Sequence, residues 1–199
     1  TSAHVDADTS GVNVGGLIGH MAGGSILGDL TSTTANIDGT TQVGGIAGLV
    51  SSSIDGNKTL SGGTVDGNTD VGGLYGQLTA IEDTGTFTLD GLTTVTGNTQ
   101  NIGGLVGLLN GGTWSTALTD SVGTITSDAD GANDIGGFFG EVSSGTINAA
   151  MNVDGGTVTG LTNASTNVGG LVGLISGGTI SGAMSNTGAN VTGAGTNVG

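Results

Sequence analysis

The six residues Ile102-Gly103-Gly104-Leu105-Val106-Gly107 belong to a unit that recurs along the chain and decides its fold. The Val/Ile-Gly-Gly tripeptide at its start also begins at Val14, Val43, Val71, Ile135 and Val168, and its first two residues return at Val198. A recurrence of about 30 residues is typical of stacked repeat architectures. Six complete units therefore lie between the first and the last of these anchors.

Each unit contains three short segments of alternating apolar and polar residues, separated by Gly, Asn or Asp, a pattern that predicts three strands and three turns. The apolar positions of the first segment are Leu17, Ile46, Leu74, Leu105, Phe138 and Leu171. The second segment centres on Ile26, Ile54, Phe87, Trp114, Ile147 and Ile180. The third centres on Val5, Ile37, Val65, Val95, Ile125, Val158 and Val191.

One unit cannot bury its few apolar side chains alone, whereas stacked units place like residues in register and build a continuous core. The sequence therefore predicts an all-β fold, a parallel β-solenoid of about six coils with three short strands each, forming one domain over residues 1–199. The absence of proline fits interior strands that donate to neighbours on both sides, and we expect glycine to supply positive φ at the corners. The competing fold, a flat β-sandwich, needs no register between distant units.

The amino-acid composition excludes several classes of partner and site. Asp and Glu total 16 against a single Lys or Arg, for a formal net charge of −15, which argues against nucleic acid and against anionic membranes as partners. Cysteine is absent, so a disulfide framework and a thiolate site are excluded. The sequence contains no stretch of 18 apolar residues, so no membrane-spanning segment is predicted. The strong negative charge fits a secreted or cell-surface protein that self-repulsion keeps soluble.

The strings Val14-Gly15-Gly16-Leu17-Ile18-Gly19 and Ile102-Gly103-Gly104-Leu105-Val106-Gly107 resemble the Glug-motif repeat, as do the strings that begin at Val71 and Val168. Phe138 and Ile46 replace the leucine in two other units. The resemblance covers nearly the whole chain as a repeat, although only one strand per unit is diagnostic. It implies a role in a bacterial surface or secreted protein, such as a haemagglutinin-like adhesin, and carries no catalytic residue.

A second apolar column consists of the residues that directly follow the apolar positions of the first segment. Strict alternation points it outward, and an exposed apolar stripe of this length is typical of an interface. We therefore expect another chain or segment to cover this column, unless the pleat is inverted. Its members are Ile18, Ala47, Tyr75, Val106, Phe139 and Val172.

Two polar columns are predicted on the surface. The residues before the anchors are Asn13, Gln42, Asp70, Asn101, Asp134, Asn167 and Asn197, and we interpret them as a ladder of side chains bonded from coil to coil, with a row of ligand-binding amides as the alternative. Threonines flank the buried residue of the third segment at Thr64, Thr94, Thr96, Thr124, Thr126, Thr157 and Thr159. A flat Thr-x-Thr array resembles ice-binding solenoids, although threonine also simply favours half-exposed strand positions.

Two other chemistries have weaker support. Asp128, Asp130 and Asp134 flank Gly131 with a spacing that suits oxygen ligands for calcium, or a solvated acidic corner, and no EF-hand glutamate follows. Catalysis is disfavoured, because His4 and His20 lie in different units without a recurrent Ser or Asp partner. We expect no cofactor other than calcium.

Together these patterns predict a non-catalytic extracellular structural or adhesive module, with ice binding through the Thr-x-Thr face as the alternative. The repeat is open at both ends, and bare strand edges normally need caps. We expect the chain to be a fragment or an assembling unit of a longer repeat array. The expected partners are further copies, other segments of the same surface protein, or an environmental or host surface such as carbohydrate or ice.

Overall fold

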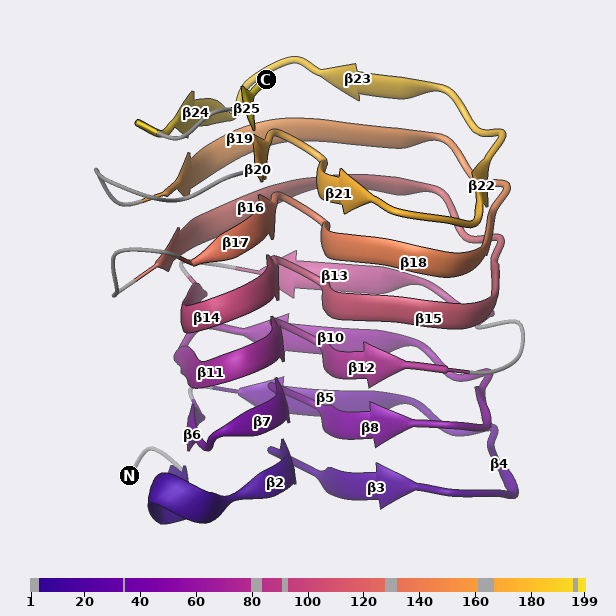
Figure 1. Cartoon of the computed structure of the whole chain (residues 1–199). Coiled ribbons are helices and arrows are strands. Elements are labelled where there is room, and N and C mark those ends of the chain that lie inside the picture. The colour runs from indigo at the N-terminus through magenta and orange to yellow at the C-terminus, as the bar shows by residue number, and fades with distance from the viewer. Residues whose placement is uncertain are drawn as a thin grey trace.

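The chain folds into a parallel β-solenoid, seen in a computed structural model that describes residues 4–33, 35–79, 84–90, 93–127, 132–160, 167–194 and 197–199. Successive turns rise along one axis, so strands far apart in sequence lie side by side (Figure 1). One strand column holds six members, one for each turn, and all its pairings are parallel. The predicted β-solenoid of about six coils is therefore confirmed.

The strands fall into five columns around the turn. The anchor column contains β2 (Val12–Gly15), β7 (Thr41–Gly44), β17 (Asn133–Gly136), β20 (Asn167–Gly169) and β25 (Asn197–Val198). Next along the chain come β3 (Ile18–Met21), β8 (Ala47–Val50), β12 (Tyr75–Leu78), β15 (Val106–Trp114), β18 (Phe139–Ile147) and β21 (Val172–Ile175). The short strands β4 (Ser25–Ile26), β9 (Ser53–Ile54) and β22 (Thr179–Ile180) follow.

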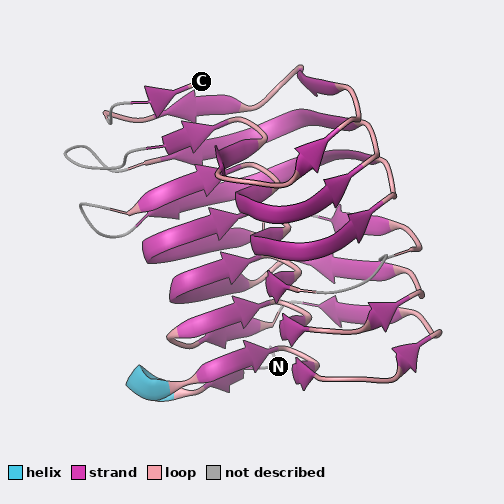
Figure 2. Ribbon diagram, turned by 45° about the vertical axis from the view of Figure 1, so that its right-hand side comes forward, coloured by secondary structure: helices cyan, strands magenta, loops and turns pink. Residues whose placement is uncertain are grey.

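The remaining two columns form the wall behind these strands (Figure 1). One contains β5 (Leu30–Thr33), β10 (Lys58–Ser61), β13 (Phe87–Asp90) and β23 (Met184–Asn186). The other contains β1 (His4–Asp6), β6 (Asn36–Asp38) and β24 (Asn190–Thr192). Longer strands join neighbouring columns, namely β11 (Thr64–Gly72), β14 (Thr94–Gly103), β16 (Leu118–Ser127) and β19 (Met151–Thr159). Figure 2 shows strands in every turn and the short 3-10 helix η1 (Asp8–Ser10) beside the first.

The seven anchors lie on top of one another. Val71 of β11 pairs with Ile102 of β14, and Ile135 pairs with Val168 one turn further on. The pairings of Val14 with Val43, of Val43 with Val71, of Ile102 with Ile135 and of Val168 with Val198 complete the column. The predicted register therefore holds over the whole stack.

The Gly-Gly of each unit is a bend between two strands where backbones of adjacent turns approach closely. A Cβ on Gly104 would come closer than 3.0 Å to the carbonyl oxygen of Gly137 in the next turn. A Cβ on Gly107 would come equally close to the backbone of Asp70 in the turn below. These glycines do not have positive φ. The motif therefore selects glycine for close backbone packing. Positive φ, expected at glycine corners, also occurs at the residue before five of the seven anchors.

The expected outward-facing apolar stripe is wrong, because its residues lie in the core. Ala47, Tyr75, Val106 and Phe139 are 0% exposed, and Ile18 and Val172 pack against the core from the terminal turns. The Gly-Gly bend interrupts the strand alternation, so the residue at the bend and the first residue of the next strand both face inward. Ile46 and Ala47, for example, are both fully buried.

The only lysine or arginine of the chain also lies in the core. Lys58 is 0% exposed; its Nζ donates to the carbonyl oxygen of Ile54 at 2.7 Å and to that of Thr84, and it lies 4.7 Å from the centroid of the Phe87 ring. Phe87 pairs in register with Lys58 and not with Ile54, so its predicted place in the second segment is wrong. It nevertheless stacks on Trp114 with 4.4 Å between the centroids.

Candidate functional site

The predicted threonines form an aligned array on the wall of third-segment strands. We call Thr64, Thr94, Thr96, Thr124, Thr126, Thr157 and Thr159 the threonine face. Its first column runs through Asn36, Thr64, Thr94, Thr124, Thr157 and Asn190, and its second through Asp38, Asp66, Thr96, Thr126, Thr159 and Thr192. Within each column, the equivalent residues of successive turns pair in register without a break.

Alternation along each strand explains why these threonines face outward. Val65, Val95, Ile125 and Val158, the residues between the two columns, are at most 1% exposed. The threonines on either side are mostly half-buried, because each is flanked by its equivalents one turn away. Methyl and hydroxyl groups thus repeat about every 4.8 Å along the axis and about every 6.7 Å along a strand.

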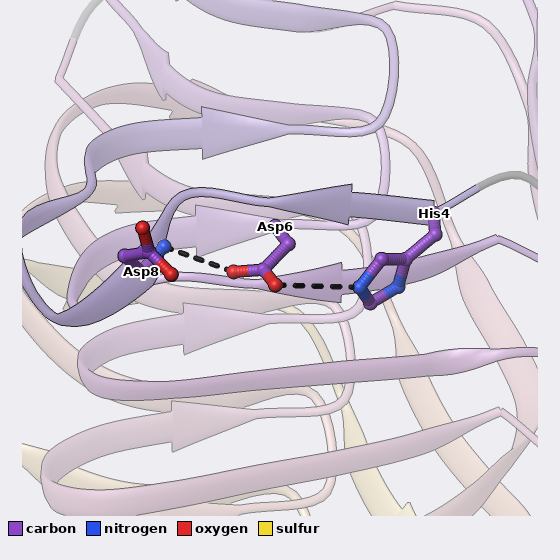
Figure 3. Close-up of polar contacts among 3 residues, drawn as sticks. All are labelled: His4, Asp6 and Asp8. Carbon is purple, nitrogen blue, oxygen red and sulfur yellow. Dashed lines mark hydrogen bonds and ion pairs between the residues drawn. The ribbon is translucent and has the colours of Figure 1, made fainter.

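The same two columns become acidic in the first turns. Asp6, Asp38 and Asp66 stand in register in the second column. His4 Nε2 lies 3.6 Å from Asp6 Oδ2, and the backbone N–H of Asp8 donates to Asp6 Oδ1 at 2.9 Å (Figure 3). With Asp8, Asn68 and Asn98, the three aspartates line a shallow groove of about 420 Å³. The wall therefore has an acidic part and a hydroxyl part.

The end of the wall formed by residues 155–199 is uncharged. The sequence from residue 155 to 199 contains no Asp, Glu, Lys, Arg or His, although the whole chain has a net charge of −15. Thr157, Thr159 and Thr192 lie within this segment. The upper end of the threonine face, at Thr157 and Thr159, is therefore uncharged, whereas at its lower end Thr64 lies two residues from Asp66 on the same strand.

A further threonine column was missed by sequence reasoning. Thr31, Thr59 and Thr88 stand in register on β5, β10 and β13. The buried residues beside them include Leu60 and Leu89. The alternation of threonine with Leu or Ser predicts a strand with outward threonines, as in the third segment. It was missed because only three strands were assigned to each coil.

The predicted polar ladder exists, and its geometry explains its residue types. Most of its residues adopt the left-handed conformation, which Asn and Asp tolerate best among residues with a side chain. The φ angles are 56° at Asn13, 53° at Gln42, 54° at Asp70, 58° at Asn101 and 62° at Asp134. Each such residue makes the corner before its anchor.

Three steps of the ladder are hydrogen bonds between neighbouring turns. Asn101 Nδ2 donates to Asp70 Oδ1 at 2.8 Å, Asn167 Nδ2 to Asp134 Oδ1 at 2.6 Å, and Asn197 Nδ2 to Asn167 Oδ1 at 2.7 Å. In each, the amide of the upper turn donates downward. The predicted coil-to-coil bonding is therefore confirmed at these steps.

Gln42 departs from this pattern. Its Nε2 donates to Gln77 Oε1 of β12 and not to the ladder residue below. The oxygen of Asn13, Oδ1, is correspondingly buried without a hydrogen-bond partner. The ladder is therefore continuous only in part.

The two carboxyl groups of the ladder are perturbed by burial. Asp70 is 6% exposed and Asp134 is 8% exposed. Loss of hydration raises the pKa of each above its usual range; the amide of Asn101 or Asn167 opposes the shift, and the charge of Glu141 adds to it.

The predicted calcium ligands are only partly placed. Asp128 and Asp130 lie outside the described residues. Asp134 is buried in the ladder, where its carboxylate accepts the amide of Asn167, and so belongs to the ladder and not to a solvent-exposed loop site. Among the residues that the structure describes, no group of three His, Cys, Asp or Glu side chains is placed to hold a metal ion.

Comparisons with known proteins add no relative. No protein-family model, curated protein or solved structure matches the chain. The resemblance to Glug-motif repeats therefore stays a prediction. In the described part of the chain, no helix is long and apolar enough to cross a membrane.

Proposed function

We propose that the chain is a non-catalytic, secreted or cell-surface β-solenoid that attaches to an extended, uncharged surface through the threonine face. The supporting observation is the unbroken register of Thr64, Thr94, Thr124 and Thr157, with Thr96, Thr126 and Thr159 beside them. A flat array of fixed groups presents little side-chain entropy to lose on contact. The buried stripe no longer offers an alternative interface.

Attachment is tested by co-sedimentation of the purified chain with cellulose, with chitin and with ice. We expect retention on at least one of these neutral surfaces, and expect Thr126→Tyr to abolish it because the larger ring breaks the flatness of the array. Thr146→Tyr is the matched control, since Thr146 is a half-buried strand threonine of β18, in register with Thr113 and Thr179 on another wall. Absence of retention on all three surfaces would refute the proposal.

Ice is a specific second candidate. The spacing of the Thr-x-Thr grid, about 4.8 Å by about 6.7 Å, favours a crystalline partner over an irregular one, because every turn repeats the same contact. For this candidate we expect thermal hysteresis at micromolar protein, a nearly complete loss of it in Thr126→Tyr, and normal hysteresis in Thr146→Tyr. Ice growth unaffected by the unmodified chain would eliminate ice as the partner while leaving attachment to cellulose or chitin open to the sedimentation test.

A further inference from the structure

The ladder segment Asp70–Asn101–Asp134 lacks one hydrogen-bond donor for its side-chain oxygens. Asn101 is 1% exposed and stands between the two aspartates, in register with Asp134 in the turn above. Its Nδ2 donates down to Asp70. Its Oδ1 is buried without a hydrogen-bond partner. In the turn above, Asp134 Oδ1 already accepts from Asn167.

The deficit does not depend on how the amide of Asn101 is oriented. An amide presents a donor on one side and an acceptor on the other. Rotating it by 180° would remove the donor from Asp70 and leave the carbonyl oxygen facing that carboxylate instead. With a carboxylate on both sides, one oxygen always faces another, and an unsatisfied buried acceptor destabilises the fold.

Among the residues that the structure describes, no positive charge is shown to act on these aspartates. The charged group that acts on both aspartates is Glu141 of β18, which is also acidic. The ladder neighbours of the pair are the amides Gln42 on β7 and Asn167 on β20, and the chain's one lysine is buried in a different column. A proton bound from solvent by Asp134 would supply the missing donor.

We infer that this segment of the ladder is a proton-binding site, in which the carboxylic acid of Asp134 donates its O–H to Asn101 Oδ1 and so joins two turns of the solenoid. The carboxylate takes one proton from water, and no other bond changes. Because this hydrogen bond between the two turns forms only when Asp134 is protonated, its contribution to stability depends on pH. This dependence is independent of what the threonine face binds.

The sign follows from the protonation of the two states. In the unfolded chain Asp134 ionises in the usual aspartate range, whereas in the folded chain burial keeps its pKa higher. As pH rises through the interval between these values, the unfolded state is favoured by ionisation while the folded state resists it. The contribution of Asp134 to stability is therefore fully present below its unfolded pKa, falls as pH rises through the folded pKa and then levels off.

The test replaces Asp134 with asparagine, whose Nδ2 donates to Asn101 Oδ1 at every pH. We expect Asp134→Asn to raise Tm by about 2–4 °C at pH 8 and to flatten the decline of Tm between pH 4 and pH 8. Asp154→Asn removes the same charge from an exposed strand position and is the control for reduced net charge. Asp134→Asn that follows Asp154→Asn at every pH, or is less stable than the unmodified chain at pH 8, would overturn the inference.

Two further measurements keep the site testable. The infrared spectrum of the unmodified chain should contain a carbonyl band of a buried protonated carboxylic acid after the exposed carboxyls have ionised, and this band should be missing in Asp134→Asn. Absence of the band from the unmodified chain would refute the site even where the variant fails to fold. If Asp70→Asn removes the band and Asp134→Asn does not, the assignment of the proton to Asp134 is wrong.

Discussion

Replacing Gly103 with alanine is expected to destabilise the solenoid by about 3 kcal/mol or more, which lowers Tm by about 6–12 °C. A Cβ at this position would lie closer than 3.0 Å to three backbone atoms, the carbonyl oxygens of Val106 and Phe138 and the amide nitrogen of Gly140. Backbone of two stacked turns cannot yield as a flexible side chain can. The substitution should therefore separate these turns locally, and thermal unfolding by circular dichroism measures the loss.

The matched control is Gly23→Ala. Nothing lies within 4 Å of a Cβ built on Gly23, and its φ is not positive. The same added methyl group should change the free energy of unfolding by less than about 0.5 kcal/mol there. Equal effects at Gly23 and Gly103 would show that the motif glycines are not selected for close contact between turns.

Truncating Trp114 to alanine should have a comparable effect, a loss of about 3–5 kcal/mol. The indole is 0% exposed, stacks on Phe87 at 4.4 Å and meets the edge of Phe139 at 5.4 Å between centroids. Its Nε1 donates to the carbonyl oxygen of Thr116 at 2.9 Å. The substitution leaves a cavity in the stacked core and an unpaired carbonyl group, and denaturant unfolding gives the cost.

Leu27→Ala controls for the loss of apolar side-chain volume, since Leu27 is 75% exposed and its truncation should be nearly neutral. Trp114 is also the only tryptophan, so its fluorescence reports this site alone. Emission should be blue-shifted in the folded chain and move to longer wavelength on unfolding. Solvent-like emission from the native protein would contradict the burial of Trp114.

The stacking register was predictable because it depends on a pattern that repeats in every unit. Val71 and Ile102 were expected in adjacent turns and pair there, and the threonines Thr94, Thr124 and Thr157 follow in the same register. A slip by one residue would turn each buried position outward. The hydrophobic repeat alone is therefore sufficient to align both the core and the face.

The inward direction of Tyr75 and Phe139 was not predictable from alternation. Alternation assumes a continuous strand, whereas the Gly-Gly bend ends one strand and begins another. Because the bend depends on backbone of the adjacent turn, its effect on side-chain direction exists only in the stack. For the same reason, the pairing of Phe87 with Lys58 and the column of Thr31, Thr59 and Thr88 appeared only in three dimensions.

By itself the sequence determined the solenoid, the order of its turns, the ladder before the anchors and the aligned threonines, because each follows from a residue type recurring once per turn. Only the tertiary structure decided that both adjacent apolar columns lie inside, how Lys58 is buried and where the ladder lacks a donor. Those properties arise between turns, from backbone contacts and loss of water that no single unit contains.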